Sequence, residues 1–392
     1  MTSRARLVVL LVSVPLILLV LVGGVLSRTM PPRNENDSYQ HLRVFDDVVS
    51  LVMNNYVEQV EADKIMSGAM RGLAEGLDPD CAWLTSADVA KFGKGNAPKA
   101  SIGVELTRQY YLRIIAARDA SPAAKAGLRT GDFIRMIDDK PTREMSVFEG
   151  MSLLGGAPGS KVKLVVIRGN AAEPHTVEVI REETGGTPVT GKLAKPGIGL
   201  VRIAAFNDRT AADLKLQVAS LTKEGAKQLI LDLRNTAEGA PELGVAPAKL
   251  FVSEGIITSR EARGESKRDI TASSGDGGVT LPVVLLVDNG TTQAAEVFAA
   301  SLSGHKRAEL IGEHTLGRAA TQELVKLPDG SGLWISTARY LTPSGAAIHE
   351  KGLAPDVAVA EPEVEFGTAP PTGDPILEKA IERIEAPATA KA

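Results

Sequence analysis

Residues 281–297 read LPVVLLVDNGTTQAAEV, an apolar run that ends in a polar turn and continues into a helix-forming stretch. A second run, QLILDL at residues 228–233, is equally short, continuous and aliphatic. Such runs are typical of strands that are buried on both faces of a parallel sheet. Because ligand sites in these sheets lie beyond the carboxyl ends of the strands, the turn after residue 287 is a candidate functional site.

The segment that begins at Gly197 alternates between predicted strands and helices. It starts with the strand GIGLVRIA, and helices are predicted at 210–224, 242–251 and 294–303. This alternation predicts an α/β core with a parallel-type sheet. The stretch DPILEKAIERI near the C-terminus predicts a short final helix.

The first half of the chain has a different pattern. Apolar stripes at helical spacing predict a small N-terminal helical unit over residues 40–95, and we interpret these stripes as core. Residues 100–183 carry short β-branched runs separated by turn residues, which predicts a small, mostly β domain. GGAPGS at 155–160 is interpreted as a plain turn, because no Lys-Ser/Thr pair follows it to open a phosphate-binding helix.

Composition excludes several classes of function. The chain has 392 residues, 44% of them hydrophobic and 23% charged, which is enough for a substantial core in two or three domains. A net charge of −4 makes nucleic acid an unlikely partner. The only cysteine, Cys81, excludes an intrachain disulfide, and the five histidines show no metal-ligand spacing. We therefore expect no metal and no cofactor.

The N-terminus predicts a membrane anchor. After Arg4 and Arg6, residues 7–26 contain no charge over 20 positions, about the length of a helix that crosses a bilayer. The following residues, GGVLSRTM, lack an A-x-A cleavage site, so an uncleaved anchor is favoured over a cleaved signal peptide. The predicted localisation is the inner membrane, single-pass, with the soluble part in the periplasm or outside the cell.

The central segment resembles a known peptide-binding domain. SPAAKAGLRTGDFIRMIDDKP at 121–141 resembles the helix, GD turn and strand of PDZ domains. SIGVEL at 101–106 stands where those domains have their carboxylate-binding loop. The resemblance implies that a peptide adds as a strand there and that backbone N–H groups bind its terminal carboxylate. The residues implied are Ile102, Gly103, Val104 and Glu105.

The flanking segments extend the resemblance over nearly the whole chain beyond the anchor. The segments at 54–85, LILDLRN, LGRAATQ and KGLAPDVAV look like those of the C-terminal processing peptidases, also called tail-specific proteases. Such serine peptidases combine a PDZ domain with an α/β core that uses a Ser and Lys dyad. The domains implied are an anchor and linker (1–38), a helical unit (39–98), a PDZ domain (99–185), a peptidase-like core (186–365) and a C-terminal helix and tail (366–392).

The chain departs from the family at the positions that carry the chemistry. Such peptidases read roughly G-S-A-S-A-S-E around the nucleophile and F-G-K-G-x-x-Q around the base. Matching these patterns to the chain puts Gln293 at the nucleophile, Arg318 at the base and Gln322 at the assisting Gln. A carboxamide cannot form the covalent acyl intermediate, and an Arg side chain stays protonated in proteins. The alignment therefore implies that neither reactive group is intact.

A third departure lies in the loop that resembles the family's N-N-P-G-G. Here it reads Asn-Thr-Ala-Glu-Gly, with Glu238 in place of the first Gly and Gly239 after it. With the backbone of Ala294, this loop is the equivalent of the oxyanion hole, and Glu238 adds a negative charge where an oxyanion would develop. Rescue by Thr291 or Thr292 with His305 or His314 is conceivable, but the threonines fit a turn and helix cap better.

Three hypotheses remain. The leading one is an inactive, membrane-anchored relative of a processing peptidase that binds protein C-termini or unfolded polypeptides as an adaptor, a decoy or a regulator of an active homologue. The second is a working serine-type endopeptidase that cleaves envelope proteins with non-standard groups. The third is a structural envelope protein in which the PDZ-like loop is unused.

Overall fold

A computed structural model gives the fold and describes residues 35–93, 100–169, 173–183, 188–362, 364–368 and 373–385. The chain divides into two compact units, one up to Met70 and one from Arg71 onward. The predicted anchor at residues 7–26 lies outside the described residues. Among the helices that are described, none combines the length and apolar character that a membrane crossing requires.

The first unit consists, where it is described, of helix α2 (Glu35–Asn55) and the beginning of helix α3 (Ala62–Glu75). The sequence predicts that the apolar stripe of α2 is core. That prediction is wrong for this helix, because Val48 is 55% exposed and Met53 is 46% exposed. The part of this unit that is described contains no further layer that could cover the stripe.

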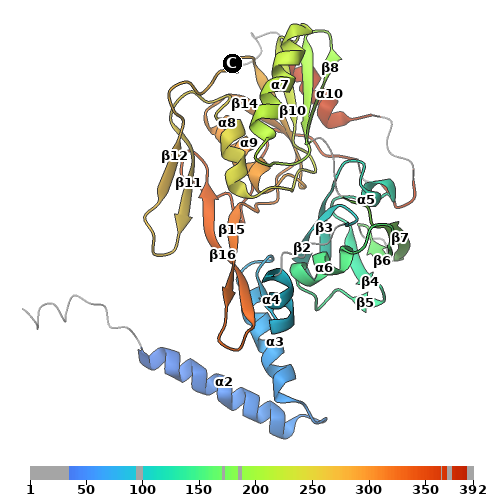
Figure 1. Ribbon diagram of the computed structural model, residues 1–392, viewed down its shortest axis with the longest axis vertical. Helices are drawn as coiled ribbons and strands as arrows, with labels where there is room; N and C mark the ends of the chain where they lie inside the picture. The colour runs from blue at the N-terminus through green and yellow to red at the C-terminus, as the bar shows by residue number, and fades with distance from the viewer. Residues whose placement is uncertain are drawn as a thin grey trace, which may run out of the picture. The chain divides into compact units, whose positions relative to one another are not determined.

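The second unit contains the PDZ-like region, which is built on an antiparallel sheet with the strand order β2-β3-β4-β6-β7 and with β5 paired to β4 (Figure 1). Its elements are β2 (Val104–Gln109), β3 (Tyr111–Ala117), α5 (Pro122–Lys125), β4 (Phe133–Ile137), β5 (Lys140–Pro141), α6 (Val147–Leu154), β6 (Lys161–Ile167) and β7 (His175–Ile180). Ser121 caps α5, and Ser146 with Glu149 forms a capping box at α6. The mostly β domain predicted for this segment is therefore present.

The sheet of the core has the strand order β17-β14-β13-β10-β9-β8. Its strands are β8 (Val189–Lys195), β9 (Ile198–Ile203), β10 (Gln228–Asp232), β13 (Val283–Val287), β14 (Ala308–Gly312) and β17 (Val357–Ala358). Within this sheet, neighbouring strands are parallel in the series β9, β10, β13, β14 and β17. Strand β8 runs antiparallel to β9. The parallel-type sheet expected from sequence is thus a mixed sheet. The reason is the tight turn at Gly197, whose φ of +85° suits glycine and which makes β8 and β9 a hairpin.

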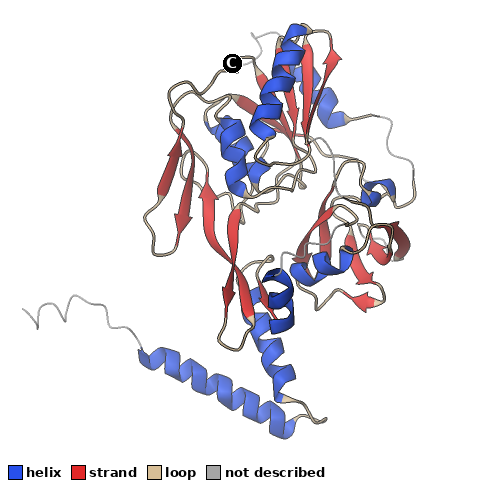
Figure 2. Cartoon of the chain, in the orientation of Figure 1, coloured by secondary structure: helices blue, strands red, loops and turns tan. Residues whose placement is uncertain are grey.

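Helices cover both faces of this core sheet (Figure 2). One face packs against α7 (Thr210–Lys223), α8 (Val245–Ala248) and α9 (Ala294–Gly304), and the other packs against α10 (Pro375–Glu385). A short 3-10 helix, η1 (Pro241–Gly244), precedes α8. Strand β13 is buried throughout and β10 is buried from Leu229 onward, which explains their aliphatic runs.

A third, antiparallel sheet has the order β1-β16-β11-β12, with β15 also paired to β16. Its strands are β1 (Ala82–Leu84), β11 (Ile256–Ala262), β12 (Arg268–Thr271), β15 (Ala320–Lys326) and β16 (Gly332–Leu341), and α4 (Ser86–Gly93) follows β1. The sequence analysis did not predict this sheet. Its strands come from distant segments, so their pairing depends on contacts that local patterns do not reveal.

Candidate functional site

The turn after β13 is held by a buried carboxyl group. Asp288 accepts hydrogen bonds from the backbone N–H of Asn235 at 2.9 Å and of Gly290 at 2.9 Å, and from the Thr291 hydroxyl at 3.0 Å. Burial raises the pKa of Asp288 to about 7, although these hydrogen bonds favour its ionised form. The Asp288 side chain therefore fixes this turn to the neighbouring loop that carries Asn235.

Gln293 occupies the last position of the turn, immediately before α9. Its backbone has φ +54° and ψ −118°, a left-handed conformation that is strained for any residue other than glycine. Hydrolases that place a nucleophile on a sharp turn between a strand and a helix use strained backbone of this kind to expose the reactive side chain. The structure thus places Gln293, the residue aligned with the nucleophile, on a turn of that type.

The carboxylate of Glu296, in the first turn of α9, connects the Gln293 turn to the Arg318 loop. One oxygen accepts from the backbone N–H of Gln293 at 3.2 Å and of Arg318 at 2.8 Å. The other accepts from the Gly317 N–H at 2.7 Å and the Thr315 hydroxyl at 2.5 Å. Because both backbone nitrogens bind the same oxygen, the positions aligned with nucleophile and base lie side by side. The sequence patterns did not reveal this role of Glu296.

The Arg318 side chain binds two groups outside its own loop. Its Nε lies 2.6 Å from the Asp80 carboxylate, and its Nη1 donates to the carbonyl oxygen of Leu106 at 3.2 Å. Burial raises the pKa of Asp80, and the charge of Arg318 opposes that rise. Arg318 thus joins the loop before β1, the PDZ strand β2 and the core. Sequence analysis did not identify Asp80 as its partner.

The loop before β1 has a second carboxylate, Asp78, which accepts from the backbone N–H of Cys81 at 2.8 Å and the Ser336 hydroxyl at 2.7 Å. Burial raises the pKa of Asp78, but hydrogen bonds from His349 and Ser336 lower it more strongly, so it stays ionised. Burial also raises the pKa of the Cys81 thiol to about 11. Cys81 is therefore a packed residue with little thiolate character.

Gln322, the residue aligned with the assisting Gln, lies in β15. Its side-chain oxygen accepts a hydrogen bond from the Trp334 indole N–H on β16 at 3.0 Å. The structure therefore gives Gln322 a partner within the antiparallel sheet.

The residues aligned with the oxyanion hole contact one another. The backbone N–H of Ala294 donates to the carbonyl oxygen of Gly239 at 3.4 Å. Gly239 has φ +117°, and a Cβ there would lie 2.4 Å from the Phe206 carbonyl oxygen, so only glycine fits. The Glu238 carboxylate forms an ion pair with Arg118 of the PDZ region. In this arrangement the Ala294 N–H points at a main-chain carbonyl.

The predicted carboxylate-binding loop lies against the same part of the core. Ile102, Gly103 and Val104 are buried, and Gly103 has φ +76°. Burial raises the pKa of Glu105 to about 7. A cavity of about 60 Å³ is lined by Gly103, Val104, Glu105, Arg118, Asn235 and Glu238, among others. The structure therefore brings the peptide-binding loop and the oxyanion-loop residues to one place.

The threonines and histidines considered for rescue have other surroundings. The Thr291 hydroxyl donates to the Leu233 carbonyl at 2.9 Å, whereas the buried Thr292 hydroxyl has no partner in the described part of the chain. The rings of His305 and His314 each bind a main-chain carbonyl, of Ile256 and Thr315 respectively, at 2.8 Å. These contacts do not orient either ring toward Thr291 or Thr292, as a triad would require.

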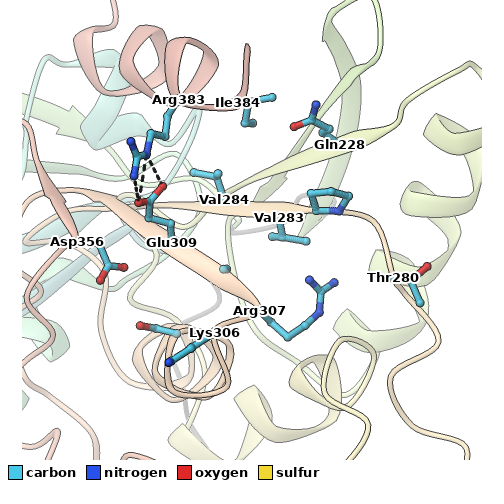
Figure 3. Close-up of a pocket in the computed structure, with 13 residues that line it drawn as sticks. Gln228, Thr280, Val283, Val284, Lys306, Arg307, Glu309, Asp356, Arg383 and Ile384 are labelled. Atoms are coloured by element: carbon cyan, nitrogen blue, oxygen red, sulfur yellow. Dashed lines mark hydrogen bonds and ion pairs between the residues drawn. The ribbon is translucent and has the colours of Figure 1, made fainter. Parts of the chain in front are cut away.

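A second, larger cavity lies at the opposite end of the core sheet, near the amino ends of β10, β13 and β14 (Figure 3). It measures about 510 Å³. Three of its charged groups bind other protein groups: Arg383 pairs with Glu309 at 2.9 Å, and Arg307 donates to three main-chain carbonyls. Across the described ranges, no cluster of three His, Cys, Asp or Glu side chains could hold a metal ion.

A PDZ-like sheet beside an α/β core, with a strained turn between strand and helix, is the arrangement that the resemblance to PDZ-containing serine peptidases implies. Residues 100–179 match the PDZ domain model, and residues 197–359 match the model of peptidase family S41. The chain is 28% identical to the carboxy-terminal-processing protease of Bartonella bacilliformis, covering 86% of this chain and 79% of that protein. It is 30% identical to the carboxy-terminal processing protease CtpA of Bacillus subtilis, covering 80% and 67% respectively.

Among solved structures, the photosystem II D1 C-terminal processing protease matches with a TM-score of 0.68 and 28% identity, over 81% of this chain and 92% of that one. The chain belongs to the carboxy-terminal processing protease family, peptidase family S41.

Proposed function

We propose that this chain is a catalytically inactive member of its family that binds protein C-termini or unfolded polypeptides through its PDZ domain, as an adaptor or regulator. The regulated partner would be an active peptidase homologue. The observation that carries the proposal is the identity of two residues: Gln293 occupies the strained turn, and Arg318, at the position of the base, is bound to Asp80.

The chemistry of these side chains supports inactivity. A carboxamide at position 293 cannot form an acyl ester, so covalent catalysis has no nucleophile there. Arg318 is a poor replacement for a Lys base, because a guanidinium is not a proton acceptor in proteins and its Nε lies 2.6 Å from the Asp80 carboxylate. The oxyanion position supports the same proposal, because the Ala294 N–H already donates to Gly239.

The proposal includes a location. Residues 7–26 would anchor the chain in the inner membrane, with the PDZ domain and core in the periplasm. The support is the length and apolar character of that segment. Exchange of these residues for a polar sequence of equal length is expected to move the protein from the membrane fraction to the soluble fraction.

The competing proposal is an active serine-type endopeptidase with non-standard groups. It is supported by similarity over most of the chain to proteins named as processing proteases. The Thr292 hydroxyl, buried and without a partner among the described residues, would be the first candidate nucleophile.

One experiment separates the two proposals. The full chain in detergent is incubated with an unfolded protein that has an apolar C-terminus, beside the variants Gln293→Ala, Thr292→Ala and the double variant Gln293→Ser with Arg318→Lys. We expect no cleavage by the unmodified chain, together with binding that requires a free C-terminal carboxylate. Cleavage abolished by Gln293→Ala or Thr292→Ala would overturn the inactive proposal.

The double variant tests what else is missing. It restores both reactive groups but leaves Glu238 beside the oxyanion position and leaves the Ala294 N–H bonded to Gly239. We therefore expect little or no cleavage until Glu238 is also replaced by Gly. Binding that is equally strong for an amidated substrate would contradict the role assigned to the PDZ loop.

A further inference from the structure

Arg118 directly follows β3 and lies beside the predicted carboxylate-binding loop. Its backbone N–H donates to the Gly103 carbonyl at 2.8 Å, which fixes Arg118 beside the loop. Its guanidinium holds the carboxylate of Glu238, which comes from the core. Arg118, the cation that lines the cavity beside this loop, therefore already has a carboxylate partner.

From this geometry we propose that Glu238 acts as an internal competitor, and that a peptide terminus must displace it from Arg118 to bind the PDZ loop. The inference rests on the proposed function, because it concerns how the same peptide site is regulated. It goes beyond that function by naming the residue of the core that opposes binding.

The size of the cavity supports the proposal. The cavity between the PDZ loop and the Glu238 loop is small, about 60 Å³. A terminal residue with its carboxylate needs more room than this cavity offers, so the proposal has Glu238 move aside when the residue enters. Binding thus requires the Glu238 side chain to leave Arg118.

The charges around the cavity also oppose a further carboxylate. Glu105 and Glu238 line the cavity together with Arg118. Arg318 is bound to Asp80. A terminal carboxylate added to this cavity would meet the like charge of Glu238, and this repulsion is relieved if Glu238 leaves.

The Glu238 loop is held in place by contacts that are separate from the ion pair. The Phe206 N–H donates to the Glu238 carbonyl at 2.9 Å, and the Thr130 hydroxyl of the PDZ region binds the Asn235 side chain. Ala237 packs with Ile115 and Ala116 of β3 in a small apolar cluster. These contacts position the Glu238 carboxylate at Arg118 without a large ordering cost, as an effective intramolecular competitor requires.

A neighbouring ion pair provides a matched control. Asp119 accepts from Arg202 of the core at 2.8 and 3.1 Å, so it also joins the PDZ region to the core. Asp119 does not line the cavity. Asp119→Asn therefore weakens the same interface without removing a carboxylate from the peptide site.

The test measures binding of a fluorescent peptide with an apolar C-terminal residue by anisotropy, using the full chain. The same peptide with an amidated terminus is the second probe. Because partly exposed ion pairs are worth up to about 1 kcal/mol, Glu238→Gln is expected to lower the Kd of the free-carboxylate peptide about three- to fivefold. The amidated peptide should show no such gain, and Asp119→Asn should show little.

Arg118→Ala completes the test as a double-mutant cycle. If Glu238 competes for Arg118, Glu238→Gln should give no gain once Arg118 is absent. An equal Kd for the wild type and Glu238→Gln, or an equal gain from Asp119→Asn, would overturn the inference while leaving peptide binding intact. Absence of binding in every variant would instead overturn the proposed function, and the inference with it.

Discussion

The predicted peptide-binding loop at residues 101–105 and the turn at residues 288–293 differ in what they have retained of the family pattern. The PDZ loop keeps both a backbone that requires Gly103 and the apolar residues around it. The turn keeps a strained backbone but presents Gln293. The difference teaches that backbone geometry and side-chain chemistry are separable, because buried acceptors such as Asp288 and Glu296 hold the turn through its backbone N–H groups.

The largest effect is expected from removal of the Glu296 carboxylate, which connects the Gln293 turn to the Arg318 loop. Glu296→Ala leaves the N–H groups of Gln293, Gly317 and Arg318 and the Thr315 hydroxyl without their buried acceptor. We expect the free energy of unfolding to fall by about 3–5 kcal/mol, measured by urea denaturation. Glu382→Ala, on an exposed face of α10, should change it by less than about 0.5 kcal/mol. Equal effects would show that Glu296 does not hold the loops.

The PDZ loop can be broken at its glycine. Gly103→Ala places a Cβ 2.5 Å from the Ser121 Cβ in a left-handed conformation, so we expect a loss of about 2–3 kcal/mol and of peptide binding. Gly127→Ala has a similar φ of +81° but open space around the new Cβ. It should cost about 1 kcal/mol and leave peptide binding unchanged. Similar losses in both variants would argue against the tight contact.

Sequence patterns predicted the parts of this site that depend on local features. The aliphatic strands β10 and β13, the turn at 288–293 and the PDZ loop were all found in this way. The partners of Arg318 were not, because Asp80 is more than 200 positions away in the chain and its pairing follows from tertiary packing. The ion pair between Glu238 and Arg118 was missed for the same reason. Sequence alignment could place Glu238 near an oxyanion but could not show which cation it binds.

The buried Asp288 predicts a pH dependence of stability. Its pKa of about 7 in the folded chain lies above the unfolded value near 4, so the folded state binds a proton more tightly. The stabilisation is present below about pH 4 and is lost as the pH rises through about 7. We expect Asp288→Asn to flatten this decline by on the order of 2 kcal/mol, measured by urea denaturation from pH 4 to 8. An unchanged slope would show that Asp288 does not titrate in this range.

The smallest expected effect concerns position 293 itself. If the backbone of the turn is imposed by Asp288 and Glu296, a residue without a Cβ should relieve its strain. Gln293→Gly is therefore expected to raise the free energy of unfolding by about 1 kcal/mol, the reverse of the usual effect of glycine. The control is Lys215→Gly on the exposed face of α7, which should lower stability by about 1 kcal/mol. If Gln293→Gly is also destabilising, the side chain of Gln293 makes contacts that outweigh the strain, and the turn would then depend on its glutamine.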